Sequence, residues 1–306
     1  MRTKVAILGA RGIGQVHARL FQKSGADICA ILGSTMQSAK QVATLLHQSL
    51  GLSPKPFDSL EALIEKTQPN ALSICTPAGC HFKQILTAFD RGLPVFCEKP
   101  MFWKKKITKE ILESQINLLS KHPNRCLFLN TSNAYFMENV IQRTGRPSTI
   151  KSFSFKFHTQ GPHRGKAIAE DLLPHGFSLL IGLLGYGKIT SLSKKAEPNS
   201  YQCQFNYKDC KVSFEFREEK DGPKHLAFSI NDREFTRVQE GEGETYRVYL
   251  KDGLNGKKIE VKDPFQIYIS RFLSGLKSDK GPGIDKFAEG AANLRMMSQV
   301  CFGDLV

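Results

Sequence analysis

The chain has 306 residues, of which 41% are hydrophobic and 24% charged, a composition typical of a globular protein with room for two domains. Its formal net charge of +14 favours anionic partners. The one dense basic run, Lys104–Lys106, has no aromatic residue near it except Trp103. We therefore expect a small anionic ligand or cofactor, and no specific binding of nucleic acid.

Apolar runs such as 177–184 are too short to span a bilayer, and the chain enters a strand without a preceding signal peptide. These features predict a cytoplasmic protein that does not bind membranes. The eight cysteines have neither zinc-site nor disulfide spacing. We expect them to be reduced, and we expect no metal site.

The first 125 residues alternate between two hydrophobic periods. Strands are expected at 3–8, 27–32, 71–75, 94–97 and 126–129, and helices at 14–24, 38–50, 59–67, 80–91 and 108–120. Alternating strands and helices indicate parallel pairing with right-handed crossovers. The pattern predicts an α/β fold that begins with a doubly wound (Rossmann) parallel sheet over residues 1–125.

The pattern changes after about residue 145, where strands follow one another with period two. Strands are expected at 149–158, 201–207, 210–217, 225–230, 233–238, 245–250 and 257–261. Helices are expected at 168–184, 264–277 and 284–300, the last two separated by Pro282 and Gly283. Residues 126–306 are thus predicted to form an α+β domain with a large, mostly antiparallel open sheet that binds substrate and other subunits.

Residues 5–19, VAILGARGIGQVHAR, place a glycine-rich turn between a strand and a helix, the context of a dinucleotide-binding turn. Gly9 allows the tight turn, and Gly14 allows close helix–strand packing. The N–H groups near Gly12 and Ile13 would face a pyrophosphate. Strict spacing asks for glycine where the chain has Arg11, so either the turn differs or this side chain lies beside the phosphates.

The second strand ends in AILGST, residues 30–35. NAD-binding sheets usually carry an acid here for the adenosine ribose hydroxyls. The chain has Gly33, Ser34 and Thr35 instead, which suit a ribose phosphate. The sequence therefore favours NADP over NAD, unless the ribose contacts come from elsewhere in the chain.

Residues 76–100, TPAGCHFKQILTAFDRGLPVFCEKP, resemble the glucose-fructose oxidoreductase / inositol dehydrogenase (Gfo/Idh/MocA) family, and so do the glycine turn and the two-domain layout. The block carries, in family order, Thr76-Pro77, His81, Ala88, Gly92 and Glu98-Lys99-Pro100.

The resemblance implies roles for these residues. Thr76 and Pro77 would contact the nicotinamide half of the cofactor, and His81 would position this segment. Glu98 would help to hold the nicotinamide ribose, and Lys99 would point toward the substrate. A lysine at the carboxyl end of such a strand can donate to a substrate oxygen.

A second family motif places an aspartate four residues before a histidine on a helix. Asp171 and His175 have this spacing, so both lie on one helical face. Many relatives add a second aspartate where this chain has Ser178, and Pro174 is expected to strain or kink the helix. The nearby loop 161–166, GPHRGK, either contributes His163 to substrate binding or is solvated.

The resulting hypothesis is an NAD(P)-dependent oxidoreductase that transfers hydride between the nicotinamide and a sugar, polyol or nucleotide sugar. Lys99 would polarise the reacting oxygen, and His175 would take or give its proton. Asp171 would either orient the histidine or bind a neighbouring hydroxyl. The alternative is a catalytically weak NAD(P)-binding sensor on the same fold. The family resemblance also implies a homodimer or homotetramer.

Overall fold

The computed structural model describes residues 2–241, 245–277 and 285–303. The chain divides into two compact units, Met1–Asn130 with Phe265–Ala291, and Thr131–Pro264 with Ala292–Val306. The sequence suggested a single boundary at residue 125, whereas the structure returns a C-terminal segment to the first unit. The predicted break at Pro282-Gly283 lies outside the described residues.

The first unit contains a parallel sheet of order β3-β2-β1-β4-β5-β6. Its strands are β1 (Lys4–Leu8), β2 (Asp27–Leu32), β3 (Lys55–Phe57), β4 (Ala71–Ile74), β5 (Val95–Glu98) and β6 (Leu127–Asn130). The crossovers contain α1 (Ile13–Lys23), α2 (Met36–Leu50), α3 (Leu60–Thr67), α4 (Ala78–Asp90) and α5 (Lys109–Ser120). The doubly wound fold is confirmed. The sequence missed only β3, an edge strand too short to show a period.

Helix α8 (Pro264–Leu276) belongs to the first unit because its aromatic residues pack on the Rossmann core. The ring of Phe272 lies 5.5 Å from that of Phe96 and 5.9 Å from that of Phe128. Tyr268 is 5.6 Å from Phe128, edge to face. All four side chains are buried, so a distant segment completes the apolar cover of the sheet.

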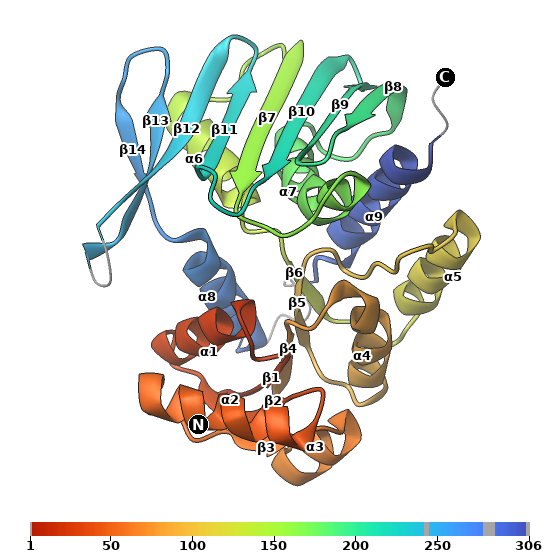
Figure 1. Ribbon diagram of the computed structural model, residues 1–306, viewed down its shortest axis with the longest axis vertical. Helices are drawn as coiled ribbons and strands as arrows, with labels where there is room; N and C mark the ends of the chain where they lie inside the picture. Colours follow the sequence, from red (N-terminus) through yellow and green to blue (C-terminus); the bar gives the residue numbers. More distant parts are fainter. Residues whose placement is uncertain (1, 242–244, 278–284, 304–306) are drawn as a thin grey trace. The chain divides into compact units, whose positions relative to one another are not determined.

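The second unit contains an eight-stranded sheet of order β14-β13-β12-β11-β7-β10-β9-β8 (Figure 1). The strands are β7 (Ser152–Thr159), β8 (Ile189–Ala196), β9 (Ser200–Tyr207), β10 (Cys210–Glu218), β11 (His225–Ile230), β12 (Arg233–Glu240), β13 (Arg247–Asp252) and β14 (Lys258–Val261). Among the described strands of this sheet, only β7 and β10 pair in parallel, so the predicted mostly antiparallel sheet is confirmed. The sequence missed β8, an edge strand whose side chains are mostly exposed.

Helices α6 (Ala134–Thr144) and α7 (Lys166–Leu184) belong to the second unit, and α9 (Phe287–Phe302) begins in the first and ends in the second. Alternate residues of β7, including Phe155 and Phe157, are buried on the sheet face that α7 covers, which we call the inner face (Figure 1). Ser154 and Lys156 lie on the opposite, outer face. The period-two pattern therefore reflects one apolar and one polar face.

Helix α7 continues through Pro174 rather than ending there. Among the described residues it is the one helix long and apolar enough to cross a membrane, although the sequence runs looked too short. In this structure 61% of the apolar stretch is buried, and a core helix passes the same test. Asn293 on α9 donates to the carbonyl of Pro174 at 3.1 Å, which ties the helix to its neighbour.

Two glycines of α7 provide a matched test of its packing. A Cβ added to Gly176 would lie 2.7 Å from the Phe214 ring, whereas one added to Gly182 would meet nothing closer than 3.8 Å. We expect Gly176→Ala to lower the free energy of unfolding by about 1–3 kcal/mol through overpacking. Gly182→Ala should raise it by about 0.5–1 kcal/mol through helix propensity. Urea unfolding measures both, and equal effects would contradict close packing at Gly176.

Candidate active site

The glycine turn joins β1 to α1 and packs against the end of β4. Gly9 has φ 81°, and an added Cβ would lie 2.8 Å from the backbone nitrogen of Thr76. A Cβ on Gly14 would lie 2.2 Å from the carbonyl oxygen of Gly9, so each position requires glycine. The departure at Arg11 is explained by Gly12, which has φ 51° and is the N-cap of α1.

The start of α1 suits an anion. Gly12 and Ile13 are exposed, and no described side chain caps the first turn of the helix. The N–H groups at a helix N-terminus attract phosphate through hydrogen bonds and the helix dipole. Arg11 is exposed beside them. The turn can therefore receive a pyrophosphate.

At the end of β2, Thr35 is the N-cap of α2, and its hydroxyl accepts from the N–H of Ser38 at 3.2 Å. Gly33 is tightly packed, because a Cβ there would lie 2.6 Å from the Ser38 hydroxyl. Ser34 is exposed. Of the predicted ribose-phosphate residues, Ser34 therefore has the least constrained side chain.

The structure adds an acid that the sequence reading missed. Asp58 follows β3, and its carboxylate accepts from the N–H of Met36 at 3.1 Å. The carboxylate thus lies at the N-terminus of α2, next to the end of β2. Only the parallel pairing of β2 with β3 brings it there.

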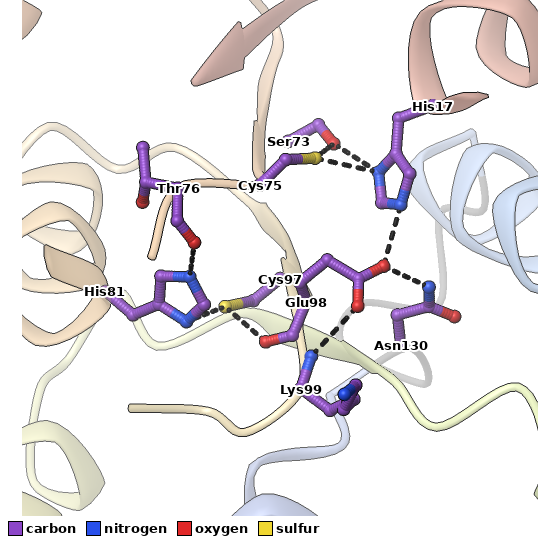
Figure 2. Close-up of polar contacts among 9 residues, drawn as sticks. All are labelled: His17, Ser73, Cys75, Thr76, His81, Cys97, Glu98, Lys99 and Asn130. Atoms are coloured by element: carbon purple, nitrogen blue, oxygen red, sulfur yellow. Dashed lines mark hydrogen bonds and ion pairs between the residues drawn. The ribbon is translucent and has the colours of Figure 1, made fainter. Parts of the chain in front are cut away.

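Glu98, the last residue of β5, is buried in a polar network (Figure 2). His17, which is completely buried, donates through Nε2 to Oε1 of Glu98 at 2.8 Å, and Asn130 donates to the same oxygen at 2.5 Å. The N–H of Lys99 donates to the other carboxylate oxygen at 3.3 Å. Glu98 therefore fixes the backbone where Lys99 leaves the sheet.

The charges in this network stabilise each other. Burial opposes charge on His17, but the Cys75 sulfur, 3.2 Å from Nδ1, and the Glu98 carboxylate outweigh it and raise the pKa of His17 to about 10. Nδ1 also lies 2.9 Å from the hydroxyl of Ser73. Burial likewise opposes charge on Glu98, yet His17 and Asn130 hold its pKa below the usual value. A buried imidazolium–carboxylate pair is the result.

His81 connects the ends of β4 and β5. It is buried, and its Nε2 lies 2.6 Å from the carbonyl oxygen of Thr76 (Figure 2). Its Nδ1 lies 3.0 Å from the carbonyl oxygen of Pro100. Burial lowers the pKa of His81, so the neutral ring donates through one nitrogen, and the shorter contact to Thr76 is the stronger candidate. The peptide bond between Lys99 and Pro100 is cis. His81 thus holds the Thr76-Pro77 segment in position through its contact with the Thr76 carbonyl.

In the second unit, α7 places Asp171 and His175 on one half-exposed face. The Asn133 amide nitrogen donates to Nδ1 of His175 at 3.1 Å. The Phe157 ring lies edge to face with the imidazole, 5.0 Å between centroids. Ser178 is buried and donates to the carbonyl of His175 at 2.8 Å. The imidazole is thereby oriented by an amide and a ring.

The loop before α7 adds a further group. The N–H of His163 donates at 2.8 Å to the fully buried carboxylate of Glu218, and its Nδ1 lies 3.1 Å from the same oxygen. Asp171 lies 3.9 Å from Nδ1 of His163. Burial raises the pKa of Glu218, and the charge of Asp171 adds to this. The sequence gave no signal for Glu218, which ends β10.

The ligand atoms of His163, Asp171 and Glu218 lie within 4.8 Å of one another, a spacing that a metal ion could bridge. The hydrogen bonds between His163 and Glu218 already give these ligand atoms partners within the protein. The absence of a metal site stays a prediction.

Comparison with known proteins also indicates a Rossmann fold in the first unit. Residues 3–127 match the GFO_IDH_MocA family model, described as an oxidoreductase family with an NAD-binding Rossmann fold. Over these residues the chain is similar to the Gfo/Idh/MocA family. The resemblance found in the sequence is thus confirmed, and so is an NAD(P)-binding type of fold at the level of the family.

Among Gfo/Idh/MocA relatives, an inositol 2-dehydrogenase from Pseudomonas syringae is 29% identical over 118 residues, which are 38% of this chain and 34% of that protein. The chain thus matches about a third of the length of this relative.

Two solved structures extend the likeness in fold to the whole chain. A UDP-N-acetylglucosamine 3-dehydrogenase from Acidithiobacillus ferrooxidans aligns over 99% of this chain and 97% of its own, with a TM-score of 0.73 and 15% identity. A myo-inositol 2-dehydrogenase from Lactobacillus plantarum aligns over 100% and 99%, with a TM-score of 0.72 and 15% identity. The second unit therefore shares their fold.

Proposed function

We propose that the chain is an NAD(P)-dependent dehydrogenase or reductase acting on a CH–OH group of a sugar, polyol or nucleotide sugar. One observation carries the proposal. In the first unit, a buried ion pair holds Lys99 at the carboxyl end of β5, and the glycine turn lies at the same end of the neighbouring strands. Ligands bind at this end of doubly wound sheets. The names of the family relatives supply the substrate class.

The residues of this chain would divide the work. The cofactor supplies the hydride chemistry when it is bound. The glycine turn would hold its pyrophosphate, and Thr76-Pro77, placed by His81, would contact its nicotinamide half. Glu98 would contribute to the nicotinamide ribose site mainly by fixing the backbone of Lys99.

Lys99 would polarise the reacting oxygen, and His175 would exchange its proton, with Asp171 nearby on the same helical face. In the neutral imidazole, the Asn133 amide nitrogen at Nδ1 places the ring proton on Nε2. In that form His175 donates a hydrogen bond to an oxygen. Proton uptake from a carbinol requires the amide to turn its oxygen toward Nδ1–H.

We retain NADP as the proposed cofactor because Gly33–Thr35 contain no acid. Asp58 opposes this preference, since its carboxylate at the start of α2 would repel a 2′-phosphate.

We expect Asp58→Asn to tighten NADPH binding severalfold and to leave NADH binding nearly unchanged, measured by fluorescence titration. Asp90→Asn is the control for charge, because it removes an exposed carboxylate at the C-terminal end of α4, where it contacts His122. A change of equal size in Asp90→Asn would make the effect one of net charge.

The activity itself is tested in two steps. Titration with NADH and NADPH should show saturable binding, and the preferred oxidised cofactor should then be reduced with at least one member of a panel of inositols, aldoses and UDP-sugars. No binding of either cofactor to the folded protein would reject the proposal.

A second candidate is a cofactor-binding sensor with little turnover. It is favoured by Ser178, which stands where many relatives carry an acid and which is bonded to the helix backbone. Tight cofactor binding without turnover across the panel would support it.

The remaining predictions concern assembly and location. We propose a small-molecule substrate, a cytoplasmic location, and a homodimer or homotetramer. The outer face of the sheet is polar, with a shallow hollow lined by side chains such as Ser154, Gln204 and Ser213. Association through this face would therefore be hydrated rather than apolar.

A further inference from the structure

Arg237 lies on the inner face of β12, the apolar face of the second unit. Phe228 pairs with Phe235 across β11 and β12, and their rings stack at 5.6 Å. Arg237 follows Phe235 by two residues and so points to the same face. On the other side, Arg237 pairs with Leu250, which is fully buried.

Among the described residues, the guanidinium of Arg237 has apolar neighbours on this face and no acidic counter-ion, and Tyr246 is the ionisable side chain that acts on it electrostatically. Its neighbours on the inner face include Leu226, Phe235 and Leu250, all buried. Among the described residues, Asp252 is an acid on that face, and it is paired with Arg233 at 2.6 Å. Within residues 2–241, 245–277 and 285–303, Arg237 makes no hydrogen bond or ion pair.

A cation in such a place is costly unless an anion joins it. The side chain of Arg237 is half-buried, and burial lowers its pKa. A desolvated charge without a partner opposes folding, whereas a bound carboxylate or phosphate would form charge-assisted bonds with the planar guanidinium. Because the side chain is not fully enclosed, a ligand can reach it.

The sheet register places Arg237 near His175. Ala227 pairs with Thr236, so the next pair in the antiparallel register is Leu226 with Arg237. Leu226 also pairs with Phe157, the residue whose ring contacts His175. Arg237 is thus two strand spacings, about 10 Å, from Phe157 along one row of the inner face. A sugar ring with one substituent can bridge such a span.

We propose that Arg237 binds an anionic group, a carboxylate or a phosphate, on the molecule whose carbinol is held at His175. This inference rests on the proposed function and narrows its substrates from sugars and polyols in general to those that carry a negative charge. Arg237 would be a specificity residue, and the reacting oxygen would not touch it.

The experiment compares sugars that differ by one charged group. Glucose, glucuronate and glucose 6-phosphate, and myo-inositol with its monophosphate, are titrated calorimetrically into the wild-type protein. We expect an anionic member to bind more tightly than its neutral partner. Arg237→Gln should weaken that binding by about 10- to 100-fold, the range for a bond to a charged group. Binding of the neutral sugar should be unchanged, and the better of the two anions identifies the group.

Two variants serve as controls. Lys251→Gln removes one positive charge from an exposed side chain of the adjacent strand β13 and should leave anion binding intact. Arg237→Lys keeps the charge but loses the planar fork, so it should retain part of the affinity. Arg237→Gln should melt no lower than wild type, because it removes an unpaired charge.

The inference is overturned if none of the anionic sugars binds more tightly than its neutral partner. It also fails if Arg237→Gln and Lys251→Gln weaken binding equally. Failure of the anion site can be distinguished from failure of the proposed dehydrogenase activity. If neutral sugars are turned over and Arg237→Gln does not change that turnover, the protein is a dehydrogenase without this anion site. Arg237-dependent binding without any turnover would leave the anion site and reject the dehydrogenase.

Discussion

Replacing Lys99 with methionine should lower kcat on the identified substrate by about 10²–10⁴-fold, the range for loss of a positioned acid, base or polarising group. Cofactor affinity should change little, because the substitution keeps the backbone N–H of Lys99 that donates to Glu98. Steady-state kinetics with a separate fluorescence titration of the cofactor would measure both quantities.

Lys105→Met is the matched control, since it removes an exposed lysine from the loop that follows the same strand and should retain wild-type turnover. His175→Gln should also be slow. If the two residues serve one step, Lys99→Met with His175→Gln should be scarcely slower than the worse single variant. A Lys99→Met enzyme with wild-type kcat would remove the central residue of the proposed mechanism.

Replacing Glu98 with alanine should lower the free energy of unfolding by about 3–5 kcal/mol, because it leaves the buried imidazolium of His17 without its counter-ion. Urea unfolding at neutral pH measures the loss. Glu65→Ala removes an exposed glutamate from α3 and should cost no more than about 0.5 kcal/mol. Similar losses in the two variants would show that the pair adds no stability.

The same pair predicts how stability depends on pH. The folded pKa of His17 is raised from 6.5 to about 10, so its stabilisation is fully present below the unfolded pKa and is lost as pH rises through the folded value. The pKa of Glu98 is lowered, so its share is present above its unfolded pKa and is lost as pH falls.

Unfolding free energies measured from neutral pH to about pH 10 should therefore decline in the wild type. His17→Gln should flatten this decline, although it is less stable throughout. An unchanged slope in His17→Gln would mean that His17 is neutral in the folded protein. Comparing slopes rather than absolute values separates the titration of His17 from the cost of the substitution.

The buried pair also explains why an apolar strand ends in two opposite charges. The sequence correctly placed Glu98 and Lys99 at the end of a strand, and the family block identified them. It did not reveal that His17 and Asn130 would enclose Glu98. His17 comes from α1, and Asn130 is the residue that faces Glu98 across β5 and β6. Such a contact depends on strand order and register, which the local pattern does not contain.

The sequence by itself determined those features that depend on neighbours along the chain. The alternation of strands and helices, the glycine turn, and the shared face of Asp171 and His175 follow from local periods and from the few conformations open to a residue. Only the tertiary structure decided what meets across the chain. It assigned α8 to the first unit, brought Asp58 to the start of α2 and left Arg237 without a hydrogen-bond or ion-pair partner among the described residues. Burial and pairing between distant segments set these outcomes, because hydrophobic packing rewards any surface of fitting shape whatever its distance in sequence.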